Sequence, residues 1–186
     1  MIQNRKVALI FFGVLCGVAL LLSACSSSDD NPLSIQFESN AFTLRYPAGW
    51  QHQIPQTNML FIASPEILAQ QSGATVTIQR SVALTSTAET LGDALDSYLE
   101  RGPLRADRDW KLVGESVRGE LDSYETVVAI VEGSEQAGTL PMRSEIHILE
   151  AESGFFFIVT LTAPIEQWET ISPVLAQIRD SIDILE

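Results

Sequence analysis

The feature that most constrains this chain is the apolar run at residues 7–22, because it decides whether the protein spans a membrane or is exported. Two basic residues precede the run, and the small residues Ser23 and Ala24 end it before Cys25. A basic start, an apolar core and small residues before a cleavage point are the three parts of a secretory signal peptide. An uncleaved spanning helix has nearly the same length, about 20 residues. The chain turns polar at Ser26 with no basic stop-transfer cluster, which favours cleavage.

Leu22, Ser23, Ala24 and Cys25 resemble the lipobox of bacterial lipoproteins, in which the cysteine becomes the lipid-bearing N-terminus. Cys16 does not fit this pattern, because a bulky leucine precedes it. The resemblance implies cleavage after Ala24 and lipidation of Cys25. Cleavage discards Cys16, so the mature chain has no internal disulfide. Two or three acyl chains make such an anchor durable, whereas a single chain binds a bilayer only marginally.

The net charge of the chain argues against some classes of binding partner. The chain has 11 basic and 24 acidic residues, a formal charge of −13, and loss of residues 1–24 removes two basic residues and leaves −15. Nucleic-acid binding requires a basic surface that displaces counterions from phosphates, and the only lysine after the signal segment is Lys111. The same acidity repels an anionic lipid surface within about 10 Å at physiological salt. We therefore expect no nucleic-acid partner, and a domain held at the lipid bilayer by acylated Cys25.

The mature chain, residues 25–186, has the length of one domain. Residues 25–34 contain Ser, Asp, Asn and Pro and predict a flexible tether. Residues 35–186 are then expected to form the domain.

Alternation of apolar and polar residues predicts most of the domain as β-strands. In residues 42–46 the apolar positions recur every second residue, and Pro47 and Gly49 mark a tight turn directly after them. Further along, Val76 and Ile78 share one strand face, with threonines and a glutamine on the other. Short connections imply antiparallel pairing. The predicted strands are residues 42–46, 51–54, 59–63, 75–82, 110–117, 124–132, 140–150 and 155–162.

Three helices are predicted between and after these strands. Residues 65–71 predict a short one, and residues 86–89, Ser-Thr-Ala-Glu, have the spacing of a capping box at the start of a second. The second helix has an apolar stripe, as does a terminal helix over residues 168–182. Pro173 predicts a kink or a restart of the terminal helix, because proline removes an amide donor. This arrangement predicts an α+β sandwich around a mainly antiparallel sheet.

Residues 42–50, Phe-Thr-Leu-Arg-Tyr-Pro-Ala-Gly-Trp, resemble the opening motif of PsbP/Mog1-like (DcrB-like) domains, and residues 154–183 resemble their closing strand and helix. The resemblance implies an α/β/α sandwich over residues 34–186. Such domains occur in photosystem II extrinsic subunits, Ran-binding proteins and bacterial envelope lipoproteins, so they share a scaffold and no chemistry. Proline ends the strand, glycine permits the turn and the aromatic residues favour burial. We therefore expect a structural role for the motif residues Phe42, Tyr46, Pro47, Gly49 and Trp50.

The sequence contains few candidate catalytic or metal-binding residues. His52 and His147 are the only side chains whose ordinary pKa lies near neutrality. Glu145 and His147 share a strand face, so a weak surface metal pair is one interpretation, but zinc sites normally have three or four protein ligands. We expect both residues to be solvated surface groups. The chain has no Gly-x-Ser-x-Gly elbow, and residues 133–138 have two glycines but no lysine, which favours a hairpin loop over a phosphate cradle.

We accordingly expect no catalytic residues, no metal site and no cofactor. An anchored domain of this kind favours a non-catalytic docking or assembly module for another envelope protein. A small-ligand or metal-binding lipoprotein, with its site in a cleft between sheet and helix, is the alternative.

Overall fold

The computed structural model describes residues 32–81, 88–106, 108–134 and 139–185, which belong to one compact unit that begins at Pro32. Residues 22–25 and the apolar run before them lie outside the described residues. Within the described part of the chain, no helix is long and apolar enough to cross a membrane.

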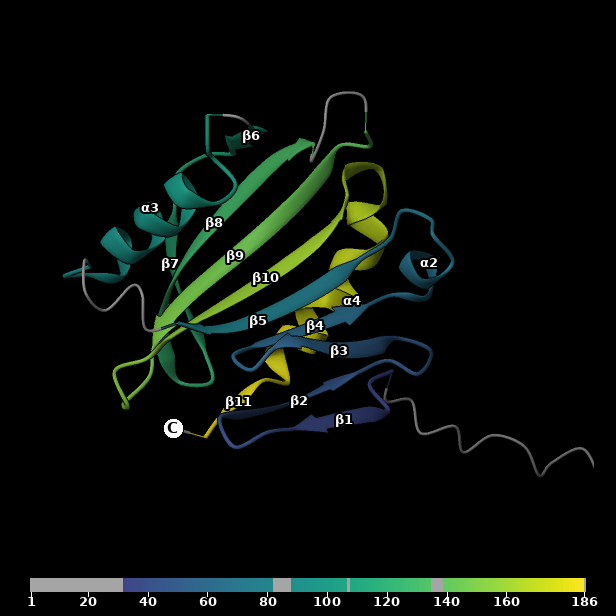
Figure 1. The fold of residues 1–186 in the computed structure, drawn as a ribbon, viewed down its shortest axis with the longest axis horizontal. Helices are drawn as coiled ribbons and strands as arrows, with labels where there is room; N and C mark the ends of the chain where they lie inside the picture. Colours follow the sequence, from purple (N-terminus) through teal and green to yellow (C-terminus); the bar gives the residue numbers. More distant parts are fainter. Residues whose placement is uncertain (1–31, 82–87, 107, 135–138, 186) are drawn as a thin grey trace, which may run out of the picture. The chain divides into compact units, whose positions relative to one another are not determined.

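The unit contains two antiparallel sheets (Figure 1). The larger sheet has the order β3-β4-β5-β10-β9-β8-β6, with β7 also paired to β8, and the smaller has the order β1-β2-β11. The strands of the larger sheet are β3 (Gln51–Gln56), β4 (Met59–Ala63), β5 (Thr75–Ser81), β6 (Asp109–Leu112), β7 (Val117–Leu121), β8 (Tyr124–Ser134), β9 (Met142–Glu150) and β10 (Phe156–Pro164). The smaller sheet consists of β1 (Ile35–Glu38), β2 (Phe42–Tyr46) and β11 (Asp183–Ile184).

Helices lie on both faces of the larger sheet. The helix α3 (Leu91–Arg101) packs on β8 and β9, and α4 (Trp168–Asp180) packs on β10 and β2 from the opposite side (Figure 1). A short helix, α2 (Pro65–Leu68), follows β4, and a 3₁₀ turn, η1 (Ile165–Gln167), leads into α4. The predicted α+β fold, a mainly antiparallel sheet between helices, is confirmed.

Strand β10 shows how the sequence builds two cores. Phe157, Val159 and Leu161 belong to the core on the α4 side, whereas Phe156 and Ile158 belong to the core on the α3 side. Successive side chains of a strand point to opposite faces. A central strand covered on both faces is therefore apolar without interruption over these positions.

Two stretches of the predicted strand pattern differ from the structure. The strand predicted at 110–117 is two strands, β6 and β7, because the register against β8 advances by two residues between the Leu112–Val131 and Val117–Val128 pairs. Gly114 in this connection has a φ of +75°, a conformation that glycine adopts without strain. The strands β1 and β11, which have few alternating residues, were not predicted.

The helix boundaries also differ. The cap of α3 differs from the predicted capping box at residues 86–89, of which 86 and 87 lie outside the described residues. The helix begins at Leu91 and Thr90 caps it: the Thr90 side chain accepts from the Asp93 amide, and the Asp93 side chain accepts from the Thr90 amide. Residues 86–89 and residues 90–93 both have capping-box spacing, and only the second set stands at the start of the helix. The helix α2 is shorter than the predicted 65–71. Pro173 lies inside α4, which continues through it without a restart.

Candidate docking face

The residues of the Phe42–Trp50 motif fix the smaller sheet against the larger one. Phe42 contacts Phe157 of β10 edge to face, with ring centroids 6.2 Å apart. The Tyr46 hydroxyl lies 2.7 Å from Nδ1 of His52 in β3, and burial raises the pKa of Tyr46. Between them, Gly49 has a φ of +89°, a backbone conformation that favours glycine. These contacts join two sheets, and none of them leaves a reactive group at a cleft.

His147 is buried and Glu145 is half-buried, which corrects the prediction that both are solvated surface groups. His147 is 4% exposed, and its Nε2 lies 2.6 Å from Oε1 of Glu145. Arg179 of α4 donates to the same carboxylate oxygen at 2.9 Å. The helix α4 thus covers a polar pair that the strand pattern alone assigned to solvent.

The electrostatics of this cluster are those of a paired buried group. The hydrogen bond with His147, and the charges of His147 and Arg179, lower the pKa of Glu145 despite the opposing effect of burial. An ionised carboxylate only accepts, so Nε2 of His147 donates. Nδ1 is buried and has no hydrogen-bond partner among the described residues. No three His, Cys, Asp or Glu side chains of the described ranges come together as a metal site.

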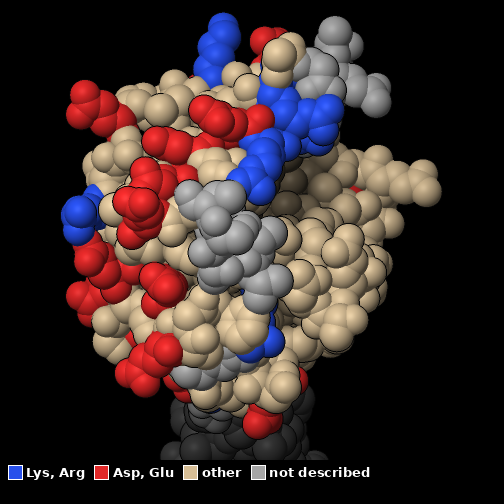
Figure 2. Space-filling view, turned by 60° about the vertical axis from the view of Figure 1, so that its left-hand side comes forward, with Lys and Arg blue, Asp and Glu red and all other residues tan. Residues whose placement is uncertain are grey.

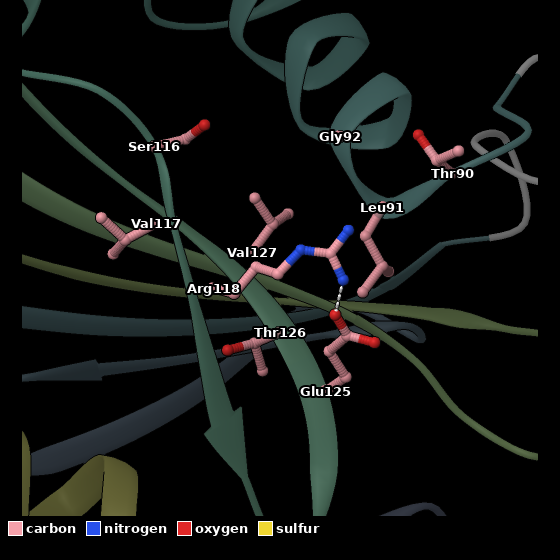
Figure 3. A pocket seen from close by; sticks show the side chains of 9 residues that line it. All are labelled: Thr90, Leu91, Gly92, Ser116, Val117, Arg118, Glu125, Thr126 and Val127. Carbon is pink, nitrogen blue, oxygen red and sulfur yellow. Dashed lines mark hydrogen bonds and ion pairs between the residues drawn. The ribbon is translucent and has the colours of Figure 1, made fainter.

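A pocket of about 440 Å³ lies between the N-terminus of α3 and the β7–β8 hairpin (Figure 3). Arg118 and Glu125 point toward one another across it and form an ion pair, with Leu91 beside them (Figure 3). Their side chains are 84% and 55% exposed. Exposed ion pairs of this kind contribute little stability and are screened by salt. This pocket therefore has no rigidly held charged group with which to bind a ligand.

A second feature is the part of the larger sheet that α3 leaves open. On the α3 side of β5 and β10, Thr75 pairs with Thr162 and Thr77 with Thr160, and all four side chains are half-buried. Phe61 of β4 lies beside Thr77 in the next strand. We call this area the open face; its half-buried or exposed members are Gln51, Gln53, Met59, Phe61, Thr75, Thr77, Gln79, Thr160 and Thr162.

The open face is uncharged in a strongly acidic protein. None of its members is Lys, Arg, Asp or Glu, although the chain carries a formal charge of −13. Figure 2 shows acidic side chains gathered on the left of the view and a broad area of other residues on the right, on the side of the sheet that faces the reader in Figure 1. An uncharged patch of this kind is typical of the centre of an interface, where charged residues are depleted.

Solved structures similar to this chain were found by comparison of folds. Cyanobacterial PsbP (CyanoP) from Synechocystis sp. PCC 6803 has a TM-score of 0.59 at 11% identity, over 88% of this chain and 99% of that one. The Saccharomyces cerevisiae Ran-binding protein Mog1p has a TM-score of 0.56 at 9% identity, over 82% and 95%. The domain has the PsbP/Mog1-like fold.

A third structure of this fold is LpqN, involved in cell envelope biogenesis of Mycobacterium tuberculosis, with a TM-score of 0.53 at 12% identity, over 83% of this chain and 86% of that one. The chain spans about half, 48%, of a similar protein from Bacteroides thetaiotaomicron. No family model and no curated protein matches the sequence. At these identities the likeness establishes the PsbP/Mog1-like fold and no activity.

The sequence contained a pattern for the open face that strand prediction did not use. Two Thr-x-Thr segments, residues 75–77 and 160–162, lie on neighbouring strands of the PsbP/Mog1-like sheet. Their alternation predicts one polar face on each strand, but only the pairing of β5 with β10 brings the four threonines together. Thr75 and Thr77 were expected on the strand face opposite Val76 and Ile78, and a joint surface with Phe61 was not expected.

Proposed function

We propose that this protein is a non-catalytic lipoprotein of the cell envelope, anchored through acylated Cys25, that docks a partner protein on its open face. The observation that carries the proposal is the uncharged open face within an acidic domain. The related fold of LpqN, a protein of cell envelope biogenesis, and of Mog1p, a Ran-binding protein, supports both halves of the proposal.

The anchor follows from the N-terminal sequence. A domain with a charge of −15 has no electrostatic attraction to an anionic bilayer, so a covalent lipid is needed to keep it there. Cys25 stands where the lipobox places the lipidated cysteine, and cleavage after Ala24 exposes its amino group. The predicted tether at residues 25–34 is short, and its last three residues already belong to the compact unit, so the domain stays near the membrane and meets partners that are themselves membrane-associated.

The partner is a different protein with a flat, uncharged patch of its own. Two copies of this chain both carry a strongly negative net charge, and this like charge opposes their association. Flatness follows from the sheet: four threonines and Phe61 stand on neighbouring strands of one pleated surface. Threonine methyl groups and an aromatic ring supply apolar contact, and the hydroxyls supply hydrogen bonds without a charge to desolvate.

The docking half is tested with a photo-crosslinking amino acid placed at Phe61 in the full chain, expressed in its native cells. We expect a crosslinked product with another envelope protein, lost when Thr77→Lys puts a charge in the centre of the open face. The matched control is Thr43→Lys, a half-buried threonine of β2 in the smaller sheet, which should leave the product intact. Products unaffected by Thr77→Lys, or only dimers of this chain, would contradict the proposal.

The anchor half is tested separately by Cys25→Ser. Without the thiol there is no acyl acceptor, so the variant should accumulate as an uncleaved precursor that takes up no labelled fatty acid. Cys16→Ser is the control, and we expect it to be processed and labelled normally. Labelling retained by Cys25→Ser would remove the lipid anchor from the proposal and leave the open face untouched.

A further inference from the structure

The two edges of the larger sheet differ in how they are protected from pairing with another chain. At one edge, β3 contains Pro55, and its register against β4 shifts between Gln53 and Gln56. Proline and an irregular register are devices that keep an edge strand from pairing with another protein. At the other edge, β7 contains no proline and keeps one register with β8 (Figure 1). Among the described residues, β8 is the only strand paired with β7, so the outer edge of β7 is unpaired there.

The turn after β7 determines which of its backbone groups face outward. Asp122 and Ser123 both have a positive φ, +48° and +64°, as in the type I′ turn of a two-residue hairpin. The pair that flanks such a turn is hydrogen-bonded, and hydrogen-bonded pairs alternate with non-hydrogen-bonded ones along an antiparallel ladder. Residues 117, 119 and 121 therefore bond to β8, and the backbone amide and carbonyl groups of Arg118 and Glu120 point away from it.

The charges of β7 favour one partner, a second copy of the same strand. In an antiparallel pair centred on Gly119, Arg118 of each copy lies opposite Glu120 of the other. The outward backbone groups of these two residues then meet as a hydrogen-bonded pair. Centring the pair on residue 118 or on residue 120 would place like charges opposite one another, which is destabilising. Of these three registers, only the one centred on Gly119 pairs opposite charges alone.

The charges within one copy leave room for this contact. Glu120 lies directly opposite Glu125 of β8, and like charges in that position repel. Arg118 forms its ion pair with Glu125, and its side chain is 84% exposed (Figure 3). A guanidinium has five N–H donors, so it can bind a second carboxylate and keep the first. Glu120 of the second copy supplies that second carboxylate, and each Arg118 then lies between two acidic side chains.

Exposed apolar side chains lie along the same edge. Leu112, Val113 and Val117 are 42%, 38% and 59% exposed, and all three follow the same side of β8. A cluster of exposed apolar side chains is typical of an interaction surface. In the register centred on Gly119, Val117 lies opposite Leu121 of the second copy, so pairing removes part of its apolar surface from water.

We infer that β7 pairs with β7 of a second copy of this chain, antiparallel and centred on Gly119, so that the larger sheets of two copies form one continuous sheet. In strand addition of this kind, main-chain hydrogen bonds supply affinity and side chains supply specificity. The net negative charge of each copy opposes association, but it is screened beyond about 8–10 Å at physiological salt, and the opposite charges on β7 attract within that distance.

This pairing is independent of the proposed function. The strands β5, β10, β9 and β8 lie between β7 and Phe61 of β4, so the pair does not bring the Phe61 side chains of two copies together. It requires neither a partner on the open face nor a lipid at Cys25. Two five-residue strands form a small interface, so we expect rapid exchange between monomer and dimer, which calls for a covalent trap.

The first trap is a cysteine at the centre of the pair. Gly119→Cys is made in the full chain, expressed in its native cells and oxidised with copper phenanthroline. Opposite residues of a non-hydrogen-bonded pair have Cβ atoms about 4.5 Å apart, which a disulfide can span. The matched control is Val117→Cys, which is also exposed, but two copies of residue 117 lie about 14 Å apart in this register. We expect a disulfide-linked dimer from Gly119→Cys only, and equal yields from the two variants overturn the inference.

A second trap leaves Gly119 intact. A Cβ at Gly119 would lie 3.1 Å from Oγ1 of Thr126, so the fold of Gly119→Cys is checked by its resistance to protease. A photo-crosslinking amino acid at the exposed Val117 gives the same information without that contact. Its dimer product should map to residues 119–123 of the second copy. Absence of a dimer from this probe, or crosslinks that map elsewhere, overturns the inference.

Charge reversal tests the register. Two differently tagged copies, both with Gly119→Cys, carry either Arg118→Glu or Glu120→Arg. Two copies of the same variant place like charges opposite one another, and the initial rate of disulfide formation should fall roughly tenfold. A mixed pair has opposite charges at both positions and should restore the rate. A mixed pair that links no faster than the two like pairs overturns the inference.

Discussion

The two halves of one sheet face differ in what covers them, and their residues differ accordingly. Along β10, Phe156 and Ile158 lie in the core under α3, and the next two residues on the same face are Thr160 and Thr162. The opposite face of the same strand stays apolar, with Val159 and Leu161 buried. The change from apolar side chains to threonine therefore marks the place where the cover by α3 ends among the described residues, and hence a place where another molecule can contact the sheet.

The largest expected effect tests that boundary directly. Ile158 of β10 and Gln79 of β5 are opposite one another in the sheet, the first 2% exposed and the second half-buried. Ile158→Ala should lower the free energy of unfolding by about 2–5 kcal/mol, because it leaves a cavity under α3. Gln79→Ala should change it by less than about 0.5 kcal/mol. Urea denaturation measures both, and equal losses would show that the boundary between the halves is misplaced.

A smaller loss of stability is expected when a polar residue under α4 is substituted. Glu145 lies on the other face, bound to His147 and Arg179. Glu145→Gln weakens both contacts to charged or buried donors and should cost about 1–3 kcal/mol at neutral pH. The comparison is sharpened by Glu125→Gln, which breaks only an exposed ion pair and should cost less than about 1 kcal/mol.

The cost of Glu145→Gln should depend on pH with a definite sign. The pKa of Glu145 is lowered in the folded state, so its contribution is fully present above the pKa of the unfolded chain, about 4.3. That contribution is lost as the pH falls through the lower, folded pKa. The difference in unfolding free energy between the wild type and Glu145→Gln should therefore shrink on acidification below about pH 4. A difference that is constant or grows in acid would contradict the pairing.

Strand positions and the PsbP/Mog1-like fold were predictable, because period-two alternation and the residues of the 42–50 motif are local. Which parts of each sheet face are buried under a helix was not predictable, because this depends on the position of helices that are distant in sequence. His147 and Thr160 have the same alternation in the sequence, yet the first is buried and the second is half-buried. Gly133 also depends on contacts that are distant in sequence: it lies within β8, close against Trp110 of β6, and a Cβ there would clash with the Asp109 carbonyl.

The smallest expected effect lies at the centre of the open face. Thr160 is opposite Thr77 and is half-buried, and α3, the described helix on this side of the sheet, packs on β8 and β9 instead. Thr160→Ala removes a hydroxyl and a methyl group that the folded domain hardly uses, so the free energy of unfolding should change by less than about 0.5 kcal/mol. The crosslinked yield at Phe61 should fall nonetheless, because in the proposed docking the partner contacts these same groups. A stability loss as large as that of Ile158→Ala would mean that Thr160 serves the domain's own core, and the two halves of the face would then be alike.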